Sequence, residues 1–156
     1  MRRASLLWAA PVLLTACGHS QAQSATTRFT ESGVEVTITV SAAQVKTIYR
    51  PTRPGFHVYS IDLPPGGIDG LGVPTRLNVR AGLTATGHAT ADKAVRLLDL
   101  PALGLKLPVY PDGLVTVSLP VRRTGPTADI VVSYGACSSS TCLAPVIDHV
   151  TTVTLR

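Results

Sequence analysis

Apolar and polar residues alternate without a break through residues 33–40, and this pattern constrains the fold more than any other feature of the chain. Successive side chains of an extended chain point to opposite faces, so the alternation predicts a strand with one buried face. The apolar side chains on that face are those of Val34, Val36, Ile38 and Val40. Shorter or less regular runs, which we also predict as strands, are residues 56–61, 76–79, 114–119, 129–134 and 150–155.

Proline and glycine separate these runs. The chain has 12 prolines and 13 glycines, and several of them cluster at residues 64–67, 111–113 and 125–126, where turns are expected. Between residues 83 and 111 the pattern is poor, and residues 89–98 could form a short helix or belong to a long loop. Six or seven short antiparallel strands at near-regular spacing predict an all-β fold, an immunoglobulin-like antiparallel β-sandwich.

The first residues have the pattern of a bacterial lipoprotein signal. Arg2 and Arg3 precede an apolar stretch, residues 4–14, and Leu14-Thr15-Ala16-Cys17 matches a lipobox at all four positions. The apolar stretch is far shorter than the roughly 20 residues that a membrane-spanning helix needs. We therefore predict a removed signal at residues 1–16, a lipidated Cys17 with a flexible tether over residues 17–27, and one domain over residues 28–156. An ordinary secretory signal with an incidental cysteine is the alternative.

Charge does not favour a nucleic-acid partner. The formal net charge of +5 includes Arg2 and Arg3, which leave with the signal. The other basic residues are scattered along the chain, with only Arg122 and Arg123 adjacent, and this distribution is typical of a solvated surface.

Two cysteines, Cys137 and Cys142, follow the predicted strand at residues 129–134. They can meet across a hairpin as a small disulfide ring. Closing a loop of roughly six residues stabilises a fold by only about 2 kcal/mol, less than the roughly 3 kcal/mol of a 15-residue loop. A change of 30 mV in reduction potential corresponds to about 1.4 kcal/mol. A disulfide that stabilises the fold so little can therefore have a reduction potential within reach of a thiol donor. With Cys17 lipidated, an even pair remains in an oxidising compartment.

Other chemistry has little support in the sequence. Cys137, Cys142 and His149 could in principle bind a soft metal, but no second cysteine or histidine pair accompanies them, so we predict no metal and no cofactor. His57 and His88 are isolated, and no Gly-x-Ser-x-Gly motif occurs. Tyr59 and Tyr134 could line the surroundings of the disulfide or could simply be core residues.

The spacing Tyr134-x-x-Cys137, a short insertion and Cys142-x-x-Pro145, together with Gly55-Phe56-His57-Val58-Tyr59, resembles the N-terminal periplasmic domain of the thiol:disulfide interchange protein DsbD. The resemblance covers residues 29–156. It implies an immunoglobulin-like fold in which Cys137 and Cys142 cycle between dithiol and disulfide, with Cys142 meeting the partner first and Pro145 near the pair. It also implies partners of the thioredoxin fold, including a disulfide isomerase and a factor of cytochrome c maturation.

The sequence departs from that family in three ways. The insertion between the cysteines is shorter, residues 143–145 replace an aromatic residue and two prolines, and residues 87–93 contain no aromatic residue to cap the disulfide. The membrane-embedded electron donor of the family would be a separate polypeptide here.

Two functions of different class follow from the sequence. The first is a lipid-anchored, exported domain that faces the periplasm or the cell exterior. It would be a protein-disulfide oxidoreductase or an electron-carrier domain, and would pass reducing equivalents through Cys137 and Cys142 to thioredoxin-fold proteins. The alternative is a non-catalytic binding or scaffold lipoprotein whose disulfide only makes an edge rigid.

Overall fold

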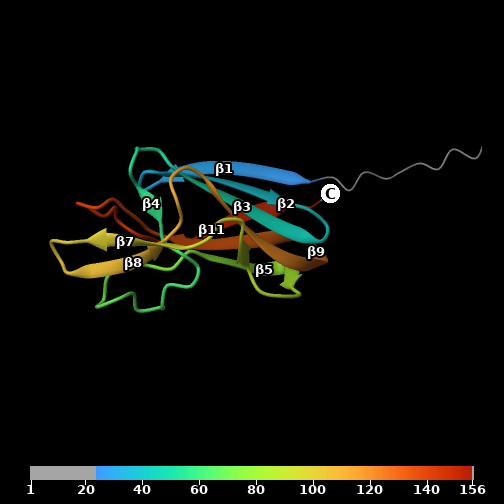
Figure 1. Cartoon of the computed structure of the whole chain (residues 1–156). Helices are drawn as coiled ribbons and strands as arrows, with labels where there is room; N and C mark the ends of the chain where they lie inside the picture. The colour runs from blue at the N-terminus through green and yellow to red at the C-terminus, as the bar shows by residue number, and fades with distance from the viewer. Residues whose placement is uncertain (1–23, 156) are drawn as a thin grey trace, which may run out of the picture.

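The computed structural model describes residues 24–155, which fold into β-strands joined by turns and loops (Figure 1). This part of the chain contains no helix, and so none that could span a bilayer. The strands are β1 (Ala25–Glu31), β2 (Val34–Val40), β3 (Gln44–Pro51), β4 (His57–Val58), β5 (Arg76–Ala85), β6 (Thr90–Ala91), β7 (Arg96–Leu100), β8 (Leu105–Val109), β9 (Val115–Tyr134), β10 (Ala136–Cys137) and β11 (Val146–Thr154). Every pairing between them is antiparallel.

Strands β1 and β2 form a tight hairpin. Their two turn residues, Ser32 and Gly33, have φ angles of +49° and +69°, the pattern of the type I′ turns that suit the twist of a hairpin. The alternating residues of β2 are buried on one face, which confirms the strand predicted at residues 33–40. Strand β1 pairs with β2 from Ala25 onward, so residues 25–27, which we had placed in the tether, belong to the sheet.

The long strand β9 is shared by both layers of the sandwich. Its first part pairs with β3 and β6, and its second part pairs with β5 and β11. The prediction of two separate strands divided by a turn at residues 125–126 is therefore wrong. The chain instead continues past Gly125, where the backbone of Gly82 lies so close that a Cβ on Gly82 would collide with the carbonyl oxygen of Thr127.

A large aliphatic core lies between the two layers. It is formed mainly by valines, leucines and isoleucines of β2, β3, β5, β9 and β11, with the buried rings of Tyr49 and Tyr134 meeting edge to face at 5.4 Å. Phe29 of β1 stacks on His149 of β11 at 3.9 Å, which brings the two outer strands together. The architecture confirms the predicted all-β, immunoglobulin-like sandwich.

Residues 83–111 are neither a helix nor a long loop. Strand β5 extends to Ala85, and β7 and β8 form a hairpin that pairs Arg96 with Val109 and Leu100 with Leu105. Leu98, Leu100, Leu107 and Val109 are buried, and together with Tyr59 and Cys137 they form a second, smaller core. The hairpin of β7 and β8 lies at the end of the sandwich opposite the start of β1 and the end of β11 (Figure 1).

Candidate redox site

The site is built on a ribbon of four short strands, β7, β8, β4 and β10. Backbone hydrogen bonds from Tyr110 N to Val58 O and from Ser60 N to Pro108 O, both 2.9 Å, join β8 to β4. On its other side β4 pairs with β10, so that Cys137 lies opposite His57. The cysteines therefore lie at the edge of the ribbon. The strand predicted at residues 56–61 is shorter than expected, because only His57–Val58 and an isolated bridge at Tyr59 are paired.

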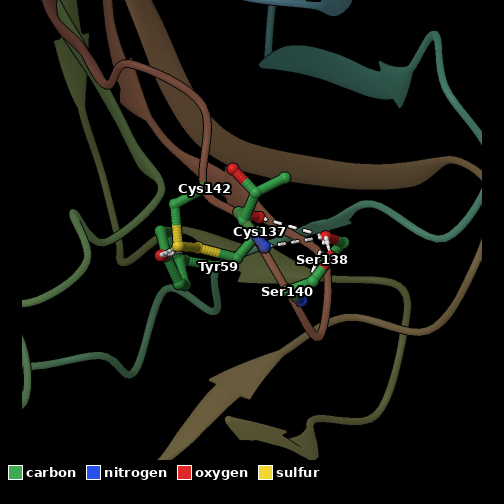
Figure 2. Close-up of a disulfide and its surroundings, with 6 residues drawn as sticks. Tyr59, Cys137, Ser138, Ser140 and Cys142 are labelled. Carbon is green, nitrogen blue, oxygen red and sulfur yellow. Dashed lines mark hydrogen bonds between the residues drawn. A yellow bond between two sulfur atoms is a disulfide. The ribbon is translucent and has the colours of Figure 1, made fainter. Parts of the chain in front are cut away.

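Cys137 and Cys142 form a disulfide across a four-residue turn (Figure 2). Ser138 organises this turn, since its backbone N–H donates to Thr141 O at 2.8 Å and its hydroxyl accepts the N–H of Thr141 at 3.1 Å. Cys137 is fully buried, whereas Cys142 is exposed. The two ends of the disulfide thus differ in access, and an incoming protein can reach Cys142 but not Cys137.

Tyr59 lies beneath the disulfide and contacts both of its ends (Figure 2). Its hydroxyl lies against Cys137 Sγ and is 3.5 Å from Cys142 Sγ. Tyr59 is 3% exposed, and burial raises its pKa to about 12. The phenol therefore keeps its proton at neutral pH and can donate a hydrogen bond to sulfur.

Two glycines make room for the Tyr59 ring. A Cβ on Gly135 would lie 2.9 Å from Cε2 of the ring, and a Cβ on Gly72 would lie 3.3 Å from Cε1. Gly72 also has a φ of +91°, which side-chain-bearing residues rarely adopt. The backbone around the ring is thus suited to hold the phenol under the sulfurs.

The other candidate residues lie in the large core or at the surface. Tyr134 belongs to the large core, where its hydroxyl donates to the backbone oxygen of Glu31 at 3.2 Å and burial raises its pKa. Pro145 is exposed, just before β11. The Nδ1 atom of His149 is 2.8 Å from a carboxylate oxygen of Glu31, and no cluster of three metal-ligating side chains occurs within residues 24–155. Cys17 lies outside the described residues.

Sequence reasoning missed a polar group beside the disulfide. His57, which is isolated in the sequence, is 4% exposed, and Nη2 of Arg96 lies 2.7 Å from its Nε2 and 3.3 Å from its Nδ1. Its Nδ1 faces Asp112 Oδ1 at 3.1 Å and Tyr110 O at 3.2 Å. Burial, followed by the charge of Arg96, lowers the pKa of His57. The two-residue spacing of His57 and Tyr59 was the signal available, because it places both on one face of a strand.

Solved structures with the same fold include two N-terminal domains. The reduced N-terminal domain of DsbD from Neisseria meningitidis superposes with a TM-score of 0.53 at 17% sequence identity, covering 81% of this chain and 93% of that domain. The N-terminal periplasmic domain of ScsB from Proteus mirabilis superposes with a TM-score of 0.56 at 16% identity. The chain shares their fold.

The match to ScsB covers 86% of this chain but 52% of the ScsB domain, so the chain corresponds to about half of that structure. No protein-family model matches the sequence. No curated protein matches it either.

Proposed function

We propose that this protein is a thiol:disulfide interchange domain that acts outside the cytoplasm. The observation that carries the proposal is the asymmetry of the disulfide, with Cys142 exposed and Cys137 buried against the hydroxyl of Tyr59. The fold shared with the periplasmic domains of DsbD and ScsB supports it.

Exchange begins when the thiolate of a reducing partner attacks Cys142 Sγ. A new sulfur–sulfur bond forms between the partner and Cys142, the bond to Cys137 breaks, and its electron pair leaves with Cys137 as a thiolate. The second thiol of the partner then attacks the mixed disulfide and releases Cys142, so the partner dithiol is oxidised and the pair is reduced. In the reverse direction the Cys142 thiolate attacks the disulfide of an acceptor, and Cys137 resolves the intermediate.

The partners that fit this chemistry are thioredoxin-fold proteins outside the cytoplasm, including a disulfide isomerase and a factor of cytochrome c maturation. A membrane-embedded donor would supply the electrons. Both follow from the resemblance to DsbD. The turn at residues 138–141 has only small polar side chains and is exposed from Ser139 onward, which leaves Cys142 approachable by a docking protein.

The deciding measurement is the reduction potential of the Cys137 and Cys142 pair in the purified protein. An exchanging pair has a potential of about −200 to −250 mV, whereas a structural disulfide lies below about −300 mV. A potential below about −300 mV would instead support the alternative function, a binding or scaffold protein with a structural disulfide.

Trapping separates the roles of the two cysteines. A Cys137→Ala variant keeps the exposed Cys142 and should accumulate a mixed disulfide with an exported thioredoxin-fold protein. A Cys142→Ala variant keeps only the buried Cys137 and should trap little. Failure of both variants to trap any such protein would contradict the proposal.

We propose further that Cys17 anchors the domain to a membrane, on the support of the lipobox at residues 14–17. Two or more acyl chains hold a protein stably on a membrane, whereas one chain does not. A Cys17→Ala variant should therefore move from the membrane fraction to the aqueous fraction of fractionated cells, while its reduction potential stays unchanged. Equal membrane association of both proteins would contradict the anchor.

A further inference from the structure

A buried histidine lies next to the buried end of the disulfide. His57 is the cross-strand partner of Cys137. Residues directly opposite each other in an antiparallel pair point to the same face, with Cβ atoms about 5 Å apart. Because His57 is 4% exposed and Cys137 is fully buried, the imidazole and the cysteine are neighbours in the interior of the protein.

His57 contacts two oppositely charged side chains. Nη2 of Arg96 lies 2.7 Å from Nε2 and 3.3 Å from Nδ1, while Nδ1 lies 3.1 Å from Asp112 Oδ1 and 3.2 Å from Tyr110 O. Burial, followed by the charge of Arg96, lowers the pKa of His57 and so favours the neutral ring. The histidine thus holds a guanidinium close to the ribbon.

The two charged neighbours of His57 are both exposed residues, and each reaches the buried ring with its charged end. At the ring the local dielectric constant is lower than in water. Arg96 has a larger effect than Asp112 on the pKa of His57, so the positive charge outweighs the negative one at this point. Arg96 also shares a face of the ribbon with Tyr59, because both pair with Val109.

We propose that Arg96, held in place by His57, is a positioning residue that favours the thiolate of Cys137 when the disulfide opens. This inference rests on the proposed exchange reaction. As a partner dithiol attacks Cys142, the electron pair of the breaking sulfur–sulfur bond goes to Cys137 Sγ. A positive charge nearby stabilises the developing thiolate, and a leaving thiol of lower pKa leaves faster. Water later supplies the proton that converts the thiolate to the thiol.

Variants of the two charged residues should act in opposite directions. In a Cys142→Ala background, where Cys137 is the free thiol of the site, Arg96→Gln should raise the pKa of Cys137 by about half a unit to one unit, as followed by the ultraviolet absorbance of the thiolate. Asp112→Asn should lower it. With both cysteines present, Arg96→Gln should slow reduction of the disulfide by dithiothreitol about threefold, and Asp112→Asn should accelerate it.

Two further variants separate charge from packing. Arg96→Lys keeps the positive charge and should keep the pKa of Cys137 near the wild-type value. Arg122→Gln removes an equal charge from an exposed position in the part of β9 that pairs with β5, away from the ribbon. It should change neither the pKa of Cys137 nor the rate of reduction by dithiothreitol. Equal pKa values of Cys137 in Arg96→Gln and Arg122→Gln would overturn the inference. A rise of that pKa in Arg96→Lys as large as in Arg96→Gln would also overturn it.

The thiolate measurement needs no partner protein. A charge effect of Arg96 without mixed-disulfide trapping would confirm that Arg96 acts on Cys137 but contradict the proposed function. Trapping without any effect of Arg96 would support the proposed function and overturn the role of Arg96.

Discussion

The hydroxyl of Tyr59 lies against the sulfur of Cys137, although the two residues are 78 positions apart in the sequence. The pairing of β4 with β10 brings them together, and Thr75 fixes the backbone of Tyr59 by donating a hydrogen bond to its oxygen at 2.6 Å. Cys137 is the buried end of the disulfide, so the sulfur that would leave during exchange is also the one closer to the hydroxyl of Tyr59. The tyrosine and the asymmetric exposure of the cysteines thus favour the same direction of attack.

Removing that donor should slow the exchange reaction. A hydrogen bond to a charged group contributes about 1.5–3 kcal/mol, so Tyr59→Phe should raise the pKa of Cys137 by about one to two units and slow reduction of the disulfide about tenfold. The measurements are thiolate absorbance and the rate of reduction by dithiothreitol. Tyr134→Phe is the matched control, because its hydroxyl donates to Glu31 and not to sulfur. It should cost about 1 kcal/mol of stability and leave the reduction rate unchanged. Equal rates in the wild type and Tyr59→Phe would rule out this role of the hydroxyl.

Strand β2 was the clearest strand in the sequence because apolar residues alone occupy its buried face. Strand β2 has four such residues, and it was predicted almost to the residue. Strand β3 also alternates, but one of its buried positions holds Thr47, so its pattern was overlooked. The break predicted at residues 125–126 was wrong because β9 continues there from one layer to the other, a long-range pairing that local turn residues do not report.

The candidate site was predictable only in part for the same reason. The cysteine pair is local in sequence, and its spacing was sufficient to expect a hairpin disulfide. The group formed by His57, Arg96 and Asp112 depends on the pairing of three strands, and no spacing in the sequence encodes it. The hairpin of β7 and β8 was missed because its buried leucines come in a segment rich in apolar residues, where strand, helix and loop cannot be distinguished by period.

His57 should make the stability of the protein depend on pH. Burial and Arg96 lower its pKa below 6.5, so the folded state binds fewer protons than the unfolded state just below that pH. The free energy of unfolding contributed by the neutral ring is therefore fully present above about pH 6.5 and is lost as the pH falls through the folded-state pKa. Urea denaturation at a series of pH values should show this decline in the wild type and a smaller one in His57→Gln. The same change of unfolding free energy with pH in the wild type and in His57→Gln would contradict the lowered pKa of His57.

The close approach at Gly82 should make this position intolerant of a side chain. A Cβ there would collide with the carbonyl oxygen of Thr127, and the backbone cannot yield without disturbing the pairing of β5 with β9. Gly82→Ala should therefore destabilise the protein by about 2 kcal/mol or more, as measured by thermal or urea denaturation. Gly66→Ala provides the comparison, since nothing lies within 4 Å of its Cβ position and its φ is not positive. A loss in Gly82→Ala no larger than in Gly66→Ala would show that β9 can shift at this point.

Gly135 offers a way to move the Tyr59 ring without removing any polar atom. A Cβ on Gly135 would lie 2.9 Å from the ring, so Gly135→Ala should push the phenol away from the sulfurs. Overpacking of this kind costs about 1–3 kcal/mol of stability, but its effect on exchange should resemble that of Tyr59→Phe, because both changes separate the hydroxyl from Cys137.

A double-mutant cycle on the rate of disulfide reduction tests this equivalence. If Gly135→Ala acts through the phenol, adding it to Tyr59→Phe should slow reduction little further, so that the two effects are far from additive. Gly66→Ala serves again as the control, and it should leave the rate unchanged in either background. Fully additive effects would mean that Gly135 acts through the backbone of β10 and not through the contact of Tyr59 with sulfur.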